Sequence, residues 1–268
     1  MYKLLALDLD GTTLNSKHTV DEDTAKSIQK IISKGIKVTI ISGREPKSIV
    51  KVAEKIGLEG LVGSMNGAII TTSDGVDHIM NLCLPRKYVE FSVRLALDMG
   101  YFPMVFVENN SYIASRKSQF SKVMDKFSDY PAKEVGNLDK YLSENNLYHK
   151  VNKVVIAAEN EELVEYKKEF ENATDACKLY FSLPFVIEVS RKDTSKGKAL
   201  EYIANSYGID KDEIIAVGDG ENDISMLGYS GKGIAMKNAM DNVKEVADEL
   251  TDSNDKKGVV KVIEKYFL

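Results

Sequence analysis

Short apolar runs alternate with longer amphipathic stretches along most of the chain. Three of these runs, at residues 4–7, 36–41 and 214–217, are predominantly apolar. A short run of this kind is typical of a central strand in a parallel sheet, because both faces of such a strand are covered. The pattern therefore predicts an α/β fold built on a parallel sheet.

The stretches between these runs carry the periodicity and the end signals of helices. Residues 21–34 begin at Asp21, a residue type that caps helices, and they are followed by Gly35. Residues 45–56 and 195–206 show the same amphipathic pattern, and each is also closed by a glycine. Alternating strands and helices are what a doubly wound sheet requires.

The pattern changes between residues 83 and 186, where longer helices are mixed with hairpin-like strands. In this stretch we expect helices at 85–99, 116–127 and 161–172 and strands at 102–107, 112–115, 151–157 and 178–183. Strand–helix alternation resumes with a strand expected at 187–189. The sequence therefore predicts a core of residues 1–82 and 187–268, interrupted by an inserted α+β domain at residues 83–186.

Two carboxylates follow the first predicted strand. Asp8 and Asp10 leave this strand on the same side, directly before Gly11. Two like charges held together need a cation, a shared proton or strong hydrogen bonds, and carboxylate oxygens favour a hard cation such as Mg2+. An ordinary Asp-Gly turn after a strand would give the same local sequence. An EF-hand loop is excluded, because its other spaced ligands are missing.

Polar residues also follow the other two apolar runs. The second run ends in Ser-Gly-Arg at residues 42–44, and the third ends in Gly-Asp-Gly-Glu-Asn-Asp at residues 218–223. Ligands bind at the carboxyl ends of parallel strands, so we expect these groups to converge on one crevice. Lys196 lies at the start of a predicted helix, where free N–H groups and the helix dipole favour an anion. Together these groups predict a site for a Mg2+-bound phosphate.

Composition and charge exclude several classes of function. The chain has 268 residues, 43% of them hydrophobic, and a formal net charge of −5 without a basic run, which argues against nucleic-acid binding. No apolar run approaches the ~20 residues of a membrane span. The first strand is expected to begin at residue 3, which leaves no room for a signal peptide. Cys83 and Cys177 lack metal-site spacing, and we expect reduced thiols in a cytoplasmic protein.

In chain order these motifs resemble those of the haloacid dehalogenase superfamily. Residues 8–13, Asp-Leu-Asp-Gly-Thr-Thr, are similar to its first motif, residues 42–44 to its second, Lys196 to its third and residues 218–223 to its fourth. With Asn-Gly-Ala at residues 66–68 and a long insert after the second motif, the set resembles the Cof-type branch, which carries a large α/β cap. The resemblance implies a Rossmann-like core with an inserted cap that selects the substrate.

The resemblance also implies a role for each matching residue. Asp8 would be the nucleophile that accepts the phosphoryl group. Asp10 would protonate the leaving oxygen, later deprotonate the attacking water, and offer its backbone carbonyl to Mg2+. Asp219 would complete the metal site beside Asp8. The phosphate would be held by the backbone of Leu9 and Gly43 and by the side chains of Ser42, Lys196 and Asn222.

Other residues near the motifs keep more than one interpretation. Asp223 is expected to orient the lysine or the water molecules of the metal. Arg44 is either a ligand of the substrate or a surface residue of the following helix. Glu188 is either a pocket residue or an ordinary carboxylate at a strand end. Asn222 could also cap the helix that follows it, and His18 is expected to have a surface or structural role.

The implied function is that of a Mg2+-dependent phosphatase acting through an aspartyl-phosphate on a small phosphorylated metabolite, such as a sugar phosphate or a nucleotide-like cofactor. One alternative is a sugar phosphomutase of the same fold, which would return the phosphoryl group to the sugar. Another is a regulator that binds a phosphorylated metabolite without turning it over. Dehalogenation is disfavoured, because a second carboxylate and a metal site have no use in that reaction.

Overall fold

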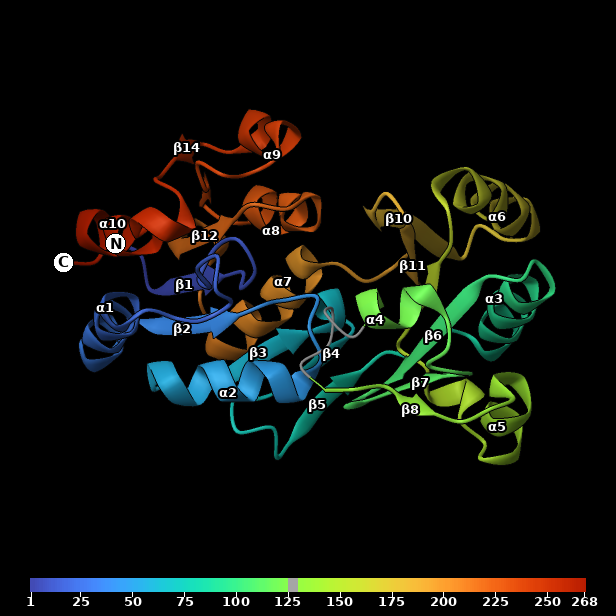
Figure 1. The fold of residues 1–268 in the computed structure, drawn as a ribbon. Helices are drawn as coiled ribbons and strands as arrows, with labels where there is room; N and C mark the ends of the chain where they lie inside the picture. The colour runs from blue at the N-terminus through green and yellow to red at the C-terminus, as the bar shows by residue number, and fades with distance from the viewer. Residues whose placement is uncertain (125–129) are drawn as a thin grey trace. The chain divides into compact units, whose positions relative to one another are not determined.

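A parallel sheet of five strands has the three predicted apolar runs at its centre. Its strands are β1 (Leu4–Leu7), β2 (Lys37–Ile40), β12 (Ile214–Gly218), β13 (Lys232–Ala235) and β14 (Glu249–Leu250). In this computed structural model, which describes residues 1–124 and 130–268, their order is β14-β13-β12-β1-β2 (Figure 1). Leu4 lies opposite Lys37 on one side and Ile214 on the other, and β1 is fully buried. The predicted α/β fold class is confirmed.

Helices from both halves of the chain pack around this sheet. They are α1 (Glu22–Ser33), α2 (Pro46–Ile56), α7 (Lys196–Tyr207), α8 (Ile224–Tyr229), α9 (Asp241–Val246) and α10 (Gly258–Tyr266). The carboxylate of Asp21 caps α1 by accepting a hydrogen bond from the N–H of Thr24, and α2 ends at Gly57 in the left-handed conformation. Helix α1 packs against α10, and α7 packs against α8. Residues from the two halves therefore share one hydrophobic core.

A small three-stranded sheet contacts the end of β2. Its strands are β3 (Leu61–Ser64), β4 (Ile69–Thr72) and β5 (His78–Asn81). A single bridge joins Ile41 to Gly63, and a 3-10 turn at Met65–Gly67 connects β3 to β4. The backbone N–H of Asn66 donates to the carbonyl of Ser42 over 2.9 Å. This hydrogen bond fixes the turn against the loop that follows β2.

The chain divides into two units, and the second has a sheet of its own. The first unit is Met1–Met80 with Ser195–Leu268, and the second is Asn81–Thr194. The second contains the strands β6 (Phe102–Val107), β7 (Asn110–Ile113), β8 (Lys133–Glu134), β9 (Lys153–Ala157), β10 (Cys177–Leu183) and β11 (Val186–Arg191) and the helices α3 (Arg86–Asp98), α4 (Gln119–Met124), α5 (Leu138–Glu144) and α6 (Asn160–Ala173). The strand order is β10-β11-β9-β6-β7-β8, and helices α3, α5 and α6 lie on one face of the sheet (Figure 1). Within residues 1–124 and 130–268, no helix has the length and apolar character of a membrane span.

The return of the chain to the first unit differs from the sequence-based prediction. The strand expected at 187–189 in the core is instead part of β11, which pairs with β9 and β10 in the second unit. Only two residues separate β10 from β11, so the chain turns back as a hairpin, and Ile187 and Val189 fill the second core. Of the helix expected at 116–127, the structure describes α4, and residues 125–127 lie outside the described residues.

Both cysteines are free thiols in the second unit. Cys177 is buried, and Cys83 is half-buried. Burial raises the pKa of the Cys177 thiol to about 11. A thiol with such a pKa is protonated at neutral pH and is a poor nucleophile.

Candidate active site

Three charged side chains meet at the carboxyl ends of β1 and β12. Asp8 follows β1, Asp223 lies in the 3-10 turn after β12, and Lys196 is the first residue of α7. The Nζ of Lys196 lies 2.5 Å from Oδ1 of Asp8 and 2.5 Å from Oδ1 of Asp223. All three side chains are buried, and the lysine is only 1% exposed. Burying a charge costs free energy unless it is paired, so each of these groups depends on the others.

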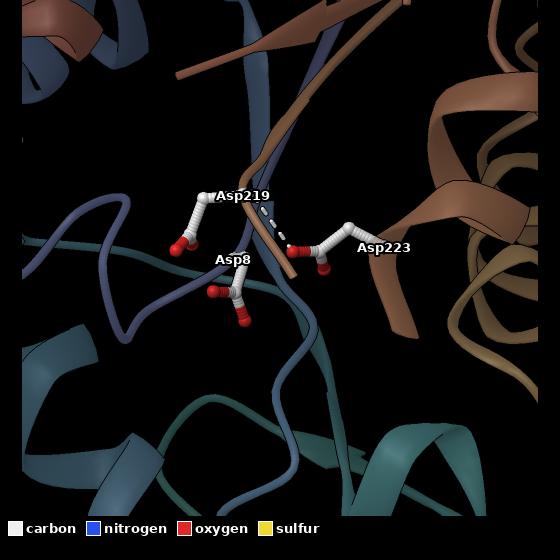
Figure 2. Close-up of side chains that lie close together, drawn as sticks. All are labelled: Asp8, Asp219 and Asp223. Atoms are coloured by element: carbon white, nitrogen blue, oxygen red, sulfur yellow. Dashed lines mark hydrogen bonds between the residues drawn. The ribbon is translucent and has the colours of Figure 1, made fainter. Parts of the chain in front are cut away.

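Asp223 also holds the loop that carries Asp219. Its Oδ2 accepts hydrogen bonds from the backbone N–H groups of Asp219 and Gly220, each over 2.9 Å. Figure 2 shows the bond to Asp219 as a dashed line. Through its two oxygens, Asp223 therefore positions both the lysine and the third carboxylate of the site.

The three carboxylates are arranged so that a cation fits between them. Asp8, Asp219 and Asp223 each offer an oxygen atom, and these atoms lie within 4.8 Å of one another (Figure 2). Lys196 supplies one positive charge against the three carboxylates. An oxygen-only donor set with excess negative charge suits a hard divalent cation such as Mg2+. The residues present therefore fit the predicted metal.

The pKa values of these groups reflect their burial first and the charges of their neighbours second. Burial raises the pKa of Asp8 well above its usual range, and the negative charge of Asp223 adds to the effect, while Lys196 opposes it. Burial alone would lower the pKa of Lys196, but the charges of Asp223 and Asp8 outweigh it and raise that pKa. Burial raises the pKa of Asp219 to about 6. A bound divalent cation would favour the ionised carboxylates.

Asp10 lies at the edge of this buried cluster and is held by Arg44. The Nε and Nη2 atoms of Arg44 donate to Oδ2 and Oδ1 of Asp10 over 2.8 and 2.7 Å. Nδ1 of His18 lies 3.5 Å from Oδ1 of Asp10. Burial acts to raise the pKa of Asp10, but the hydrogen bonds and charge of Arg44 outweigh it and lower that pKa. Arg44 is thus engaged with a residue of the first motif.

The residues expected to hold a phosphate lie at the same strand ends. Ser42 is buried, and its Oγ accepts a hydrogen bond from the N–H of Arg44 over 3.2 Å. Nδ2 of Asn222 donates to Oδ1 of Asn66 over 2.9 Å, which joins the loop after β12 to the turn after β3. A Cβ atom at Gly43 would lie 3.1 Å from that Asn66 oxygen, so the small residue allows the close approach. The first unit brings together Asp8, Leu9, Asp10, Ser42, Gly43, Arg44, Lys196, Asp219, Asn222 and Asp223.

Glu188 lies in the second unit and has partners there. Its Oε2 accepts a hydrogen bond from the hydroxyl of Tyr180 over 2.9 Å and lies 3.1 Å from Nζ of Lys153. It is therefore not among the residues that the first unit brings together. These contacts form a nearly buried polar cluster on the sheet of the second unit.

Two threonines to which no motif gave a role also support the site. The hydroxyl of Thr13 donates to the carbonyl oxygen of Asp8 over 2.5 Å, and the hydroxyl of Thr12 donates to Oδ1 of Asp219 over 2.8 Å. Between them and Asp10, Gly11 has a φ of +74°, and a Cβ atom there would lie 2.1 Å from Oδ2 of Asp219. Their place inside the first motif is a signal that could have identified both threonines.

Two asparagines also stabilise the loops of the site. Asn66 binds Asn222, and Nδ2 of Asn238 donates to the carbonyl of Gly11 over 2.8 Å. Asn66 belongs to the Asn-Gly-Ala sequence noted above. Asn238 comes shortly after the strand β13, and a polar residue at that position was the only sequence signal for it.

Comparisons with known proteins cover the whole chain. The model of a family described as haloacid dehalogenase-like hydrolase matches residues 5–263. Phosphatase YwpJ of Bacillus subtilis (strain 168) is 31% identical over 281 residues, covering 96% of this chain and 97% of that protein. From the same organism, the 5-amino-6-(5-phospho-D-ribitylamino)uracil phosphatase YitU is 28% identical over 270 residues, covering 98% and 97%. A solved haloacid dehalogenase-like hydrolase from Bacteroides thetaiotaomicron has a TM-score of 0.90 and 26% identity, with 100% of both chains covered.

Proposed function

We propose that this chain, which belongs to the haloacid dehalogenase-like hydrolases and is a phosphatase, hydrolyses small phosphorylated metabolites. The proposed reaction requires Mg2+ and passes through a phosphoryl group carried on Asp8. The observation that carries the proposal is the buried pairing of Lys196 with Asp8 and Asp223 beside Asp219. Packing alone does not call for two carboxylates on one lysine with a third carboxylate beside them, because surplus buried charge is destabilising. A site that receives a cation and a phosphate does call for them.

In the proposed first step, a carboxylate oxygen of Asp8 attacks the phosphorus atom of the ester. The bond between phosphorus and the leaving oxygen breaks, and Asp10 donates its carboxyl proton to that oxygen, which departs as an alcohol. In the second step, the Asp10 carboxylate takes a proton from water, whose oxygen attacks the phosphorus atom on Asp8. The bond to Asp8 then breaks, so inorganic phosphate leaves and both aspartates are restored.

The residues around Asp8 would hold the phosphate during both steps. Lys196 contacts the carboxylate that receives the phosphoryl group, so its ammonium is placed to neutralise charge on the phosphoryl oxygens. Ser42, Asn222 and the backbone N–H groups of Leu9 and Gly43 are the proposed hydrogen-bond donors. The role of these residues is positioning, on which phosphoryl transfer chiefly depends.

Mg2+ would be held by the carboxylates of Asp8 and Asp219 and by the backbone carbonyl of Asp10. Asp223 is close enough to offer an oxygen atom as well, but both of its oxygens already accept hydrogen bonds, so its proposed role is to fix Lys196 and the backbone of Asp219. When bound, Mg2+ would neutralise the charge of the phosphate and of the carboxylates that face it.

We further propose that the leaving group is the alcohol of a small metabolite, such as a sugar phosphate or a nucleotide-like cofactor. The relative YitU is named for a substrate with a phosphate on a ribityl chain, which is an alkyl phosphate. An alkoxide is a poor leaving group unless it is protonated as it departs, and a positioned acid such as Asp10 would supply that proton. The second unit is proposed to select the metabolite, since the residues assigned to the chemistry lie in the first unit.

The proposal is tested by measuring inorganic phosphate released from 4-nitrophenyl phosphate and from a panel of phosphorylated metabolites. The protein is first treated with a chelator and then assayed with and without added Mg2+. We expect release only with Mg2+, and faster release from some metabolites than from the aryl ester. Binding without release would favour a regulator, and rearrangement of a sugar phosphate without release would favour a phosphomutase. Full activity without a divalent cation would contradict the metal assignment.

A further inference from the structure

Arg44 and Asp10 form a two-pronged ion pair at the edge of the buried cluster. Nε and Nη2 of the guanidinium each donate to a different oxygen of the Asp10 carboxylate, over 2.8 and 2.7 Å. We propose that Arg44 is a positioning residue, whose fork fixes the orientation of the carboxylate that exchanges protons with the leaving group and with water. The inference rests on the proposed function, because it concerns the acid and base of that reaction.

Asp10 needs such a partner because its own surroundings leave it free to rotate. Its side chain is 48% exposed, whereas Asp8 is buried. The terminal torsion of an aspartate is broad, so packing that covers only half of the side chain does not select one orientation. Two parallel hydrogen bonds from a planar guanidinium do select one. His18 offers a single contact at 3.5 Å, which leaves the carboxylate plane undefined.

Arg44 is itself held from the opposite side of the site. Its backbone N–H donates to Oγ of Ser42 over 3.2 Å, and its carbonyl accepts from the N–H of Met65 over 3.0 Å. Its side chain is only 18% exposed. The orientation of Asp10, which follows β1, is therefore set from the loop after β2, and a backbone hydrogen bond from the turn after β3 holds that loop.

The position of Arg44 next to Ser42 and Gly43 would also suit a phosphate ligand, and the two roles differ in their kinetic effects. A ligand of the phosphate binds every ester, so its loss raises KM or slows all substrates alike. A residue that positions the acid contributes to the rate only as far as the leaving group needs a proton. Its loss therefore lowers kcat for alkyl phosphates, whose alkoxides need protonation, and spares 4-nitrophenyl phosphate, whose leaving group departs without it.

The experiment compares Arg44→Lys and Arg44→Ala with the wild-type protein in single-turnover assays of leaving-group release. The substrates are 4-nitrophenyl phosphate and the sugar phosphate that the wild-type protein hydrolyses fastest. We expect both variants to lose about tenfold or more with the sugar phosphate and about twofold or less with the aryl ester. Lysine keeps the charge but lacks the fork, so it should not rescue the rate. Arg86→Lys, which alters an exposed ion pair with Glu90 on α3, is the matched control.

The same assay is repeated in an Asp10→Asn background. Since Arg44 is proposed to act through Asp10, Arg44→Ala should then lower the single-turnover rate with the sugar phosphate by no more than about twofold, instead of the tenfold or more expected when Asp10 is present. A wild-type protein that released no phosphate from any ester would overturn the proposed function. Three results with an active wild-type protein would overturn this inference alone. In the first, the Arg44 variants slow both esters equally. In the others, they raise only KM, or Arg44→Ala adds its full effect to that of Asp10→Asn. Wild-type rates in Arg44→Lys would overturn it too.

Discussion

A substitution at Asp8 should affect activity strongly and stability only slightly. Asp8→Asn keeps the size of the side chain, and it removes one of three neighbouring carboxylates while Lys196 keeps its contact with Asp223. We expect turnover to fall by roughly a thousandfold or more, because an amide cannot accept the phosphoryl group, while the free energy of unfolding changes by about 1 kcal/mol or less. Phosphate release and thermal unfolding measure the two effects. Substantial activity in a folded Asp8→Asn protein would rule out the proposed nucleophile.

Lys196 and Lys198 differ in burial, and the difference predicts opposite behaviour. Lys196→Met leaves Asp8 and Asp223 buried without their cation, which should cost about 3–5 kcal/mol of stability and roughly a hundredfold in kcat/KM. Lys198 is exposed, and Lys198→Met should change both quantities little. Urea unfolding and steady-state kinetics of the pair provide the comparison. If Lys198→Met were the more damaging change, the third motif would be misplaced.

The positions of individual side chains were predictable only where a motif fixed them. The sequence placed Asp8, Asp219 and Lys196 at neighbouring strand and helix ends, because the ends of parallel strands share one edge. The fork between Arg44 and Asp10 could not be predicted in this way. It depends on side-chain torsions and on a turn held by Met65, which strand and helix patterns do not describe.

Helices α7 and α8 approach closely at Gly197, and this contact positions the start of α7. A Cβ atom at Gly197 would lie 2.2 Å from the carbonyl oxygen of Ser225, whereas one at Gly228 of α8 would meet nothing within 4 Å. Gly197→Ala should destabilise the protein by about 1–3 kcal/mol and lower kcat through the neighbouring Lys196. Gly228→Ala should stabilise it by up to about 1 kcal/mol, because alanine favours helices. Denaturant unfolding of both variants tests this, and equal effects would contradict the close packing.

At the level of elements, the sequence predicted the central strands well and one boundary wrongly. The runs at 4–7, 36–41 and 214–217 correspond to β1, β2 and β12, because strands buried on both faces are continuously apolar. β11 was assigned to the wrong unit. A short strand with apolar residues at Ile187 and Val189 suits either sheet, and its pairing with β9 and β10 decides between them.

Metal binding should be visible in the stability of the whole protein as well as in its activity. A ligand that binds the folded state alone raises the free energy of unfolding by about 2.7 kcal/mol at a hundred times its Kd. We therefore expect Mg2+ to raise the melting temperature of the chelator-treated protein. Asp219→Asn should remove that rise, whereas Asp252→Asn, at an ion pair with Lys261, should retain it. An equal rise in both variants would place the cation elsewhere.

The division into two units predicts that specificity can be exchanged without the chemistry. Replacing residues 81–194 by the corresponding unit of a relative with a different preference should change the ranking of substrates. Phosphate release should still require Asp8, because the groups assigned to phosphoryl transfer lie in the first unit. The measurement is the substrate panel, with Asp8→Asn in the chimera as the control. A folded chimera that kept the original ranking would place the specificity determinants in the first unit.

The long separation between Asp8 and Lys196 has a consequence for the newly made protein. They are 188 positions apart in sequence, with the whole second unit between them. At roughly 5–20 residues per second, the ribosome adds the lysine about 10–40 s after the aspartate. The strand β12, beside which β1 lies, is added later still. A nascent chain can therefore complete its second unit while Asp8, the proposed nucleophile, still lacks a counter-charge, so catalytic competence is among the last properties that synthesis confers.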